Sequence, residues 1–295
     1  MTTLVIGASG LLGSNVAVAA HDRSQDVLGT YHTTDLGLSI DSKQCDITDR
    51  AKVQSLLEAS DPDLVVNCAA VTDVDECEQK QKAAQAVNAE APKTIAEHCA
   101  KANIQFVHVS TDYVFDGNQH KPYAVDDDPN PIQQYGQTKN AGEHAVEAMA
   151  PSAIIVRPSF IYGIHRGSET LTGFPSWVAG ELRSGNSVPL FTDQYVTPSR
   201  AGQVAEVILN LARENASGIF HVACRDCITP YEFGQRVARR IDTDGAIVES
   251  SQTDVEREAP RPTYTCLDVQ RVENQLQQAQ PTLQDDLDRL SFSQI

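Results

Sequence analysis

Three glycines at three-residue spacing, Gly7, Gly10 and Gly13, directly follow the first apolar run of the chain. This run is short and rich in branched side chains, which predicts a buried strand, and the pattern from Leu11 onward predicts a helix. Glycine permits a tight turn, a close approach of the backbone to a phosphate and close packing of helix on strand. The start of the helix offers free N–H groups to an anion. The segment therefore predicts a cradle for a dinucleotide pyrophosphate, with a plain turn as the alternative.

Short runs rich in Val and Ile alternate with longer amphipathic stretches over the first 160 residues. The runs predict strands at 3–6, 26–31, 64–67, 104–109 and 153–156, and the stretches predict helices at 11–20, 50–59, 83–102 and 132–150. Asn130 is expected to cap the last helix, with Pro131 in its first turn. This alternation predicts the α/β class, a Rossmann-type doubly wound parallel sheet covered on both faces. The loops that follow the strands should then share one edge of the sheet.

After Gly163 the alternation loosens into loops rich in Gly, Ser, Thr and Pro. Helices are predicted near 175–184, 200–214 and 230–241, with a short strand near 219–222. We expect residues 1–160 to form a dinucleotide-binding Rossmann domain. Residues 161–295 should form a smaller C-terminal substrate-binding lobe, with some exchange of chain between the two parts.

The charge of the chain is strongly acidic, with 40 Asp and Glu against 23 Lys and Arg and a formal net charge of −17. Such a surface repels nucleic acid and anionic membranes, so neither is expected as a partner. Only eight of the basic residues are Lys. An acidic, lysine-poor surface is suited to a protein that functions in concentrated salt, where ions screen the repulsion between its own negative charges. The sequence starts without a secretory pattern and has no run long enough to span a membrane, which favours a cytoplasmic location.

The seven cysteines are an odd number scattered along the chain, which is not typical of a disulfide framework. Cys224 and Cys227 form a CxxC pair, but no second pair stands at zinc-site spacing. A structural role is favoured over metal or redox chemistry. None of the eight His residues shows metal-ligand spacing, and no metal is expected.

Tyr135 and Lys139 lie four residues apart on a predicted helix and so share one face. An ammonium beside a phenol, together with the positive ring of an oxidised nicotinamide, should bring the phenol pKa down from about 10. Thr111 follows the strand at 104–109, at the same sheet edge as the glycines. We predict a reduction in which Tyr135 donates the proton, Lys139 also holds the cofactor ribose and Thr111 orients the carbonyl. A solvated helix pattern is the alternative for the Tyr–Lys pair.

The second predicted strand ends at Tyr31 and His32, with no acid before Asp35. An acid at this position normally binds the ribose 2′-hydroxyl, so its absence favours NADPH, with NADH as the second choice. Asp46 and the following Ile47 are expected near the adenine, although Asp46 could instead cap the next helix. Ala69 and Ala70 follow the predicted strand at 64–67, and their small side chains would let a flat cofactor lie against the backbone. The alternative is that they only pack the end of this strand.

Several segments resemble the dTDP-4-dehydrorhamnose reductase family, extended short-chain dehydrogenases/reductases that reduce a 4-keto sugar to dTDP-L-rhamnose. The matching segments are 66–78, 86–92, STDYVFDG at 110–117, 131–139, 157–163, 193–198, 218–221, 261–262 and 267–268. The resemblance covers nearly the whole chain. It implies NAD(P)H-dependent reduction of a 4-keto nucleotide sugar, most specifically dTDP-4-dehydro-L-rhamnose. A homodimer is among the expected assemblies.

The motifs and the resemblance together assign a set of site residues. They are Thr111, Tyr135 and Lys139 as catalytic residues; Gly7, Ser9, Gly10, Leu11, Leu12, Gly13, Asp46, Ile47, Ala69, Ala70, Tyr135 and Lys139 around the cofactor; and Thr72, Asp112, Tyr113 and Phe160 at the substrate. Thr72 and Asn88 are expected to support the structure of the site rather than to contact the substrate directly. Phe160 departs from the family, which usually has Trp there. Phenylalanine keeps the apolar contact and loses the indole N–H donor.

Two other functions are compatible with these motifs. A nucleotide-sugar epimerase or dehydratase shares the fold and the Tyr–Lys pair, but dehydratases generally place two acidic residues after the catalytic Thr. Here Asp112 is followed by Tyr113. A non-catalytic, NADP-binding regulatory subunit also resembles this family, and the intact Thr, Tyr and Lys set argues against it.

Overall fold

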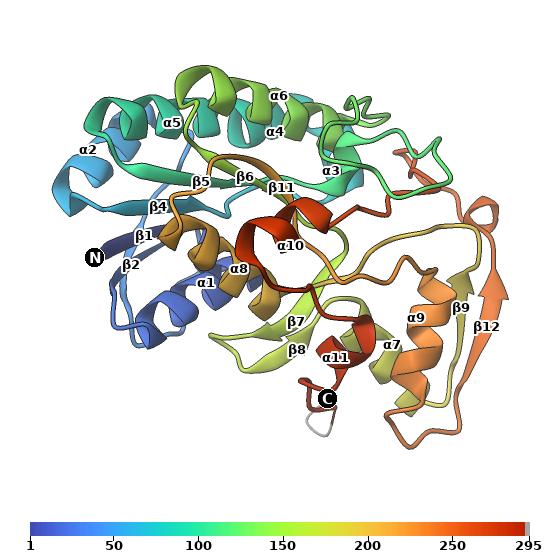
Figure 1. Ribbon diagram of the computed structural model, residues 1–295. Helices are drawn as coiled ribbons and strands as arrows, with labels where there is room; N and C mark the ends of the chain where they lie inside the picture. The colour runs from blue at the N-terminus through green and yellow to red at the C-terminus, as the bar shows by residue number, and fades with distance from the viewer. Residues whose placement is uncertain (293–295) are drawn as a thin grey trace.

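The computed structural model describes residues 1–292, and a seven-stranded parallel sheet forms its centre (Figure 1). Its strands run in the order β11-β6-β5-β4-β1-β2-β3, and every neighbouring pair is parallel. Their bounds are β1 Thr2–Ile6, β2 Asp26–Tyr31, β3 Asp41–Gln44, β4 Leu64–Asn67, β5 Gln105–Val109, β6 Ile154–Arg157 and β11 Gly218–His221. The chain winds outward from β1 in both directions, so a crevice opens at the strand ends between β1 and β4. The predicted Rossmann-type fold is confirmed.

Helices cover both faces of this sheet, as Figure 1 shows. On one face lie α1 (Leu11–Asp22) and α8 (Ala201–Arg213), and on the other lie α2 (Arg50–Ser60), α5 (Ala91–Ala102) and α6 (Gln134–Met149). Side chains alternate between the two faces of a strand, so neighbouring residues of β1 belong to different apolar clusters. Val5 packs beneath α1 and α8, whereas Leu4 and Ile6 pack beneath α2, α5 and α6.

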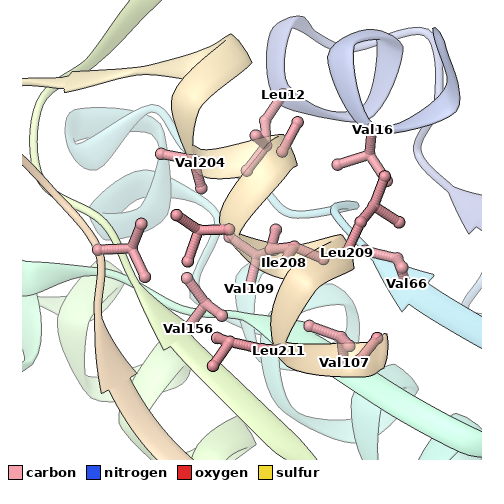
Figure 2. Close-up of a cluster of buried hydrophobic side chains, with 14 of the residues drawn as sticks. Leu12, Val16, Val66, Val107, Val109, Val156, Val204, Ile208, Leu209 and Leu211 are labelled. Carbon is pink, nitrogen blue, oxygen red and sulfur yellow. The ribbon is translucent and has the colours of Figure 1, made fainter. Parts of the chain in front are cut away.

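The core beneath α1 and α8 is almost wholly aliphatic (Figure 2). Its labelled members come from α1, three strands and α8: Leu12, Val16, Val66, Val107, Val109, Val156, Val204, Ile208, Leu209 and Leu211. All are buried, at 8% exposure or less. Burial of this kind stabilises a fold by about 1.5–3 kcal/mol per large side chain. It therefore holds α1, and the loop that precedes it, rigidly against the sheet.

The remaining elements form a smaller region at one side of the sheet (Figure 1). It contains a three-stranded sheet of β10 (Ser199–Arg200), β7 (Ile161–His165) and β8 (Thr170–Thr172), and a parallel pair of β9 (Ser187–Phe191) with β12 (Ala246–Ser250). Its helices are α7 (Phe174–Arg183), α9 (Pro230–Ala238) and α11 (Leu283–Leu287), whereas α10 (Gln270–Leu276) packs against β11 and α8 of the main sheet. A separate apolar cluster around Tyr162, Leu182 and Phe233 holds most of these elements together.

Several local predictions differ from the structure. The strand expected near 219–222 in the small lobe is β11, which pairs with β6 in the main sheet. Strand β3 was not predicted, since its sequence DSKQ is polar and largely exposed. The helix expected at 83–102 consists of α4 (Gln81–Gln85), a π-helical turn (Ala86–Glu90) and α5. The division into two domains at residue 160 stays a prediction.

The predicted cap of α6 was wrong. Gln133 caps this helix, and its side-chain oxygen accepts a hydrogen bond from Gly136 N at 2.7 Å. Asn130 instead donates through Nδ2 to Asp116 Oδ2 at 3.1 Å, outside the helix. The helix thus starts at Gln134, two residues later than expected.

The cysteines also differ in part from the expectation. Cys227 forms a disulfide with Cys266, 39 residues away, while Cys224 is a free, buried thiol. The CxxC pair is therefore not bonded within itself. No helix among residues 1–292 is long and apolar enough to cross a membrane. In the same residues, no group of three or more His, Cys, Asp or Glu side chains could hold a metal ion.

Candidate active site

A cavity of about 840 Å³ opens at the carboxyl ends of β1, β4 and β5. Every residue predicted for the site lines it: Gly7, Ser9, Gly10, Leu11, Leu12, Gly13, Asp46, Ile47, Ala69, Ala70, Thr72, Thr111, Asp112, Tyr113, Tyr135, Lys139 and Phe160. These residues come from segments up to 153 positions apart (160 − 7). The fold therefore brings them together in one place, as the parallel-sheet prediction required.

The glycine loop is shaped for close backbone approach. Gly7 has a φ of +78°, and a Cβ there would lie 2.8 Å from Ala69 N. A Cβ on Gly13 would lie 2.1 Å from Gly7 O, so helix and turn could not pack as they do. A Cβ on Gly10 would meet only Gly7 O, at 3.4 Å. The loop is thus tight on its protein side and open toward the cavity, and the uncapped N-terminus of α1 follows it. This cradle fits a dinucleotide pyrophosphate.

The ends of β2 and β3 bound one end of the cavity. His32, Asp46 and Ile47 line it there. Asp46 Oδ1 accepts hydrogen bonds from Thr48 N at 2.9 Å and Thr48 Oγ1 at 2.7 Å, which lower the pKa of this carboxyl. Helix α2 is capped by Asp49, so the alternative that Asp46 serves as the cap was wrong. The contact of Asp46 with adenine stays a prediction.

Helix α6 presents Tyr135 and Lys139 to the cavity. The Lys139 side chain is buried, and its Nζ donates to Val109 O at 2.6 Å. Burial lowers the pKa of Lys139 to about 8, while the nearby carboxylate of Glu143 opposes this shift. Burial also raises the pKa of the Tyr135 phenol well above its usual 10, against the influence of a hydrogen bond with Thr111. The predicted lowering of the phenol pKa is therefore not seen, because burial and the neighbouring carboxylate of Asp112 both raise it.

Behind Lys139, a buried ion pair fixes α6 to the sheet. Arg157 on β6 donates from Nε to Glu143 Oε1 at 2.9 Å and from Nη2 to Oε2 at 2.6 Å. The two side chains are 2% and 1% exposed. The guanidinium also lies 5.2 Å from the ring centroid of Phe115. Glu143 is one turn beyond Lys139, so this pair sets the electrostatic environment of the lysine as well as the position of the helix.

A second buried anchor joins α6 to the segment after β4. Asn88 Nδ2 donates to Val71 O at 3.0 Å and to Thr138 Oγ1 at 3.2 Å, and its Oδ1 accepts from Val71 N at 2.9 Å. Asn88 therefore supports the site without lining it. Thr72, the next residue, does line the cavity.

The segment after β5 carries Thr111, Asp112 and Tyr113. Thr111 Oγ1 donates to Asp112 Oδ1 at 3.1 Å and accepts from Tyr113 N at 3.2 Å. Asp112 Oδ2 accepts from Ser159 Oγ at 2.7 Å, and the side chain is almost fully buried. Burial raises the pKa of Asp112 to about 6, although hydrogen bonds from neighbouring hydroxyls oppose this. The Asp112 carboxylate is thus held mainly by the protein, and its predicted contact with substrate stays a prediction.

Aromatic rings line part of the cavity. Phe160 lines the cavity, with its ring centroid 5.2 Å from that of Phe174 and 6.3 Å from that of Phe233. Its φ of +47° is unusual for a residue with a side chain, and such backbone strain often occurs at functional sites. On the other side, the Tyr113 ring meets Tyr135 edge-on at 6.1 Å. Phe160 and Tyr113 therefore both give the cavity apolar surface, and their predicted contact with substrate stays a prediction.

The sequence did not single out several further residues that line the cavity. They are Thr30, Tyr31, His32, Cys45, Cys68, Val71, Val74, Glu76, Val87, Val109, Ser110, Pro158 and Ile161. Five of them directly precede or follow a predicted residue, which is the signal that could have found them: Cys45, Cys68, Val71, Ser110 and Ile161. Ser110 is notable because its buried hydroxyl has no hydrogen-bond partner among residues 1–292. Glu76 and Val74 come from α3 (Val74–Gln79), whose place over the cavity no local pattern indicates.

The chain is similar to known proteins over nearly its whole length. The family described as "RmlD substrate binding domain" matches residues 1–292. A protein of Haloferax volcanii named "Probable low-salt glycan biosynthesis reductase" is 48% identical, over 97% of this chain and 96% of that protein. The dTDP-4-dehydrorhamnose reductase of Mycolicibacterium smegmatis is 33% identical, over 91% of this chain and 78% of its own length.

A solved structure agrees with these sequence matches. The crystal structure of a dTDP-4-dehydrorhamnose reductase from Clostridium acetobutylicum has a TM-score of 0.87 against this chain. The identity is 28%, and the match covers 97% of each chain. The similarity therefore includes the small region as well as the main sheet.

Proposed function

The chain belongs to the RmlD family of dTDP-4-dehydrorhamnose reductases and is an NAD(P)H-dependent oxidoreductase; from this premise we propose that it reduces the 4-keto group of a nucleotide-linked sugar. The proposed reaction is dTDP-4-dehydro-L-rhamnose to dTDP-L-rhamnose, with NADPH preferred and NADH accepted. One observation carries the proposal: Thr111, Tyr135 and Lys139 line the same cavity as the glycine loop.

The residues that would hold the cofactor fit its parts. The glycine cradle and the N-terminus of α1 suit the pyrophosphate, and Ala69 and Ala70 leave room beside β4. Lys139 would hold the ribose next to the nicotinamide. When bound, the dihydronicotinamide supplies the hydride for the keto carbon.

Tyr135 supplies the proton to the keto oxygen. Burial keeps its phenol protonated near neutral pH, which is the form that an acid catalyst of reduction needs. The hydroxyl of Thr111 lies at the same part of the cavity and would orient the oxygen between the two side chains. The buried hydrogen bonds of Thr111 with Asp112 and Tyr113 hold that hydroxyl in place.

The far side of the cavity suits a charged, sugar-bearing substrate. Phe160 and Tyr113 offer apolar faces for the sugar ring. The Arg257 guanidinium lies over the ring of Phe191 at 4.9 Å and interacts electrostatically with Tyr113. Its neighbour Arg261 is paired with Asp75, at 2.9 Å. Arg257 does not line the cavity, but among residues 1–292 it has no carboxylate within ion-pair distance, and its interaction with Tyr113, which lines the cavity, favours a role near the diphosphate of the substrate.

The test is an assay of NADPH oxidation with a panel of 4-keto sugars linked to dTDP, UDP and GDP. We expect turnover with at least one member, and the preferred nucleotide identifies the substrate. Isomerised product without net NADPH oxidation would instead assign an epimerase. NADPH binding without turnover on any member would favour a regulatory role. Either result would overturn the proposed reduction.

A further inference from the structure

The hydroxyl of Thr111 has one proton to donate and two lone pairs that accept. One lone pair accepts from Tyr113 N at 3.2 Å, and the proton is donated to Asp112 Oδ1 at 3.1 Å. These two bonds hold the Thr111 oxygen in place. A keto oxygen, however, only accepts hydrogen bonds. Thr111 therefore cannot orient the keto oxygen of a substrate while its single proton points at Asp112.

The carboxyl group of Asp112 is enclosed by protein. The residue is 3% exposed, and its Oδ2 accepts from the buried Ser159 Oγ at 2.7 Å. Its backbone N–H donates to Pro158 O at 3.0 Å, which ties it to the segment after β6. Among residues 1–292, no Lys, Arg or His side chain forms an ion pair with Asp112. The carboxyl oxygens therefore face hydroxyl groups and no cation.

A proton on Asp112 removes the conflict over the Thr111 hydroxyl. With this proton on Oδ1, the carboxyl donates to Thr111 Oγ1 across the same 3.1 Å, while Oδ2 still accepts from Ser159. Thr111 then accepts from Tyr113 N and from Asp112, so its own proton is free to point into the cavity, which Thr111 lines. With an ionised Asp112, the same rotation would set an oxygen lone pair against a carboxylate oxygen and leave a buried acceptor without its donor, which is unfavourable.

We propose that Asp112 is a positioning residue that acts as the carboxylic acid: it donates to Thr111, and Thr111 in turn donates to the keto oxygen beside Tyr135. Asp112 then acts through Thr111 and not by contact with the substrate. It gives up no proton in the reaction, because the proton on the product oxygen comes from Tyr135 and the hydride from the cofactor. The inference rests on the proposed reduction of a ketone in this cavity.

The surroundings of Asp112 set the pH range in which the acid is present. Burial raises the pKa of this carboxyl to about 6, against the opposing influence of the neighbouring hydroxyl groups. The Asp112 charge influences the phenols of Tyr113 on the same turn and Tyr135 on α6, and burial raises the pKa of both. Both phenols therefore stay neutral up to pH 8.5. Arg257 and Arg261 act on Tyr113 and keep their charge throughout this range.

The buried cations Lys139 and Arg157 are bound to other groups. Lys139 Nζ donates to Val109 O at 2.6 Å, and Arg157 is paired with Glu143. Burial lowers the pKa of Lys139 to about 8, so this ammonium titrates at a higher pH than the Asp112 carboxyl. A loss of activity that begins near pH 6 is therefore distinct from one caused by Lys139.

The experiment measures initial rates of NADPH oxidation from pH 5.5 to 8.5, with the 4-keto nucleotide sugar that the wild type reduces fastest. The proteins are wild type, Asp112→Asn, Thr111→Ser and Thr111→Val. Asp128→Asn serves as the control that should behave as wild type, because Asp128 is exposed. Titration with NADPH, followed by fluorescence, shows that each variant is folded.

In the wild type we expect kcat/KM to fall about 25-fold between pH 5.5 and 7.5, because only the acid form binds the ketone productively. The change in kcat should be smaller, since bound substrate keeps Asp112 in that form. Asp112→Asn should lack most of the fall, because its amide N–H donates to Thr111 at every pH. Thr111→Ser should keep the fall. Thr111→Val should lose about 10²-fold in kcat/KM at pH 5.5 and lack the fall in the activity that remains.

A wild-type kcat/KM that is flat from pH 5.5 to 7.5 overturns the inference. A fall of wild-type size in Asp112→Asn or in Thr111→Val does so as well, because the pH dependence would then arise elsewhere or bypass the Thr111 hydroxyl. Loss of activity in Asp112→Asn at every pH, with NADPH binding kept, has the same meaning. A wild type that binds NADPH and reduces none of the sugars instead overturns the proposed reduction itself.

Discussion

Tyr135 illustrates how one side chain depends on its surroundings. Its phenol is half-buried beside Tyr113 and interacts with the hydroxyl of Thr111. Burial disfavours the phenolate, so the proton stays on the side chain until a stronger base forms at the substrate oxygen. A role as proton donor in reduction therefore agrees with the direction of the pKa shift.

Removal of this one hydroxyl should separate chemistry from binding. For Tyr135→Phe we expect kcat to fall by about 10²–10⁴-fold, because the proton donor is lost. The dissociation constant for NADPH, from fluorescence titration, should change less than about twofold, since ring packing is kept. Tyr195→Phe is the control, because Tyr195 is 40% exposed and outside the cavity lining. Retained turnover in Tyr135→Phe would remove this residue from the role.

Asp112 allows a prediction about pH and stability. Its pKa in the folded protein is about 6, above the usual 3.8, so folding favours the protonated form. The stabilisation linked to this proton is complete below about pH 4 and is lost as the pH rises through about 6. Relative to wild type, Asp112→Asn should therefore gain about 2 kcal/mol of unfolding free energy between pH 4.5 and 7.5.

Urea denaturation at several pH values measures this difference. Asp128→Asn is the matched control, because it removes the same charge from an exposed position. A constant difference between Asp112→Asn and wild type from pH 4.5 to 7.5 would show that Asp112 stays ionised in the folded protein.

At the level of elements, α6 carries two of the proposed catalytic side chains and is held by contacts that are not catalytic. Gln133 caps its first turn, Asn88 binds Thr138, and Arg157 pairs with Glu143. A buried pair of this kind often adds little net stability when formed, yet loss of one partner leaves the other charge unpaired.

Arg157→Met should therefore reduce the free energy of unfolding by about 3–5 kcal/mol in urea titrations. The double variant Arg157→Met, Glu143→Leu should recover much of this loss, because no charge is then left buried. Arg50→Met removes a surface pair with Glu97 and should change stability by less than about 1 kcal/mol. If the double variant is as unstable as the single one, packing rather than the unpaired charge is responsible.

For the whole molecule, charge is the dominant feature. A net charge of −17, with only eight lysines, implies substantial self-repulsion at low ionic strength. Salt bridges such as that between Arg225 and Glu273 neutralise only part of it. At 1 M salt the screening length is about 3 Å, so most repulsion between separate surface charges disappears.

We therefore expect the thermal midpoint to rise markedly between 0.1 and 2 M KCl, measured by circular dichroism. Net repulsion is the cause, so the gain should be larger with KCl than with an uncharged osmolyte at the same osmolality, which stabilises only by its exclusion from the protein surface. A midpoint that is flat or falls with KCl would refute the interpretation of the acidic surface.

Features that depend on short stretches were predictable from the sequence. The glycine loop, the five buried strands of the predicted sheet and the Tyr135–Lys139 spacing each depend on residues close in the chain. Parallel topology then placed the polar residues after the strands at one edge, including Thr111 and Asp112. The location of the cavity therefore followed from local patterns plus one general rule of sheet winding.

Only the tertiary structure decided the features that depend on distant partners. Strand β3 is polar and exists through its pairing with β2. Cys227 forms a disulfide with Cys266 rather than with Cys224, its partner in the CxxC pair. The ammonium of Lys139 on α6 donates to the carbonyl oxygen of Val109 on β5, 30 residues earlier in the chain. Hydrogen-bond partners and burial are properties of the packed molecule, so pKa values and strand pairing could not be read from residue spacing.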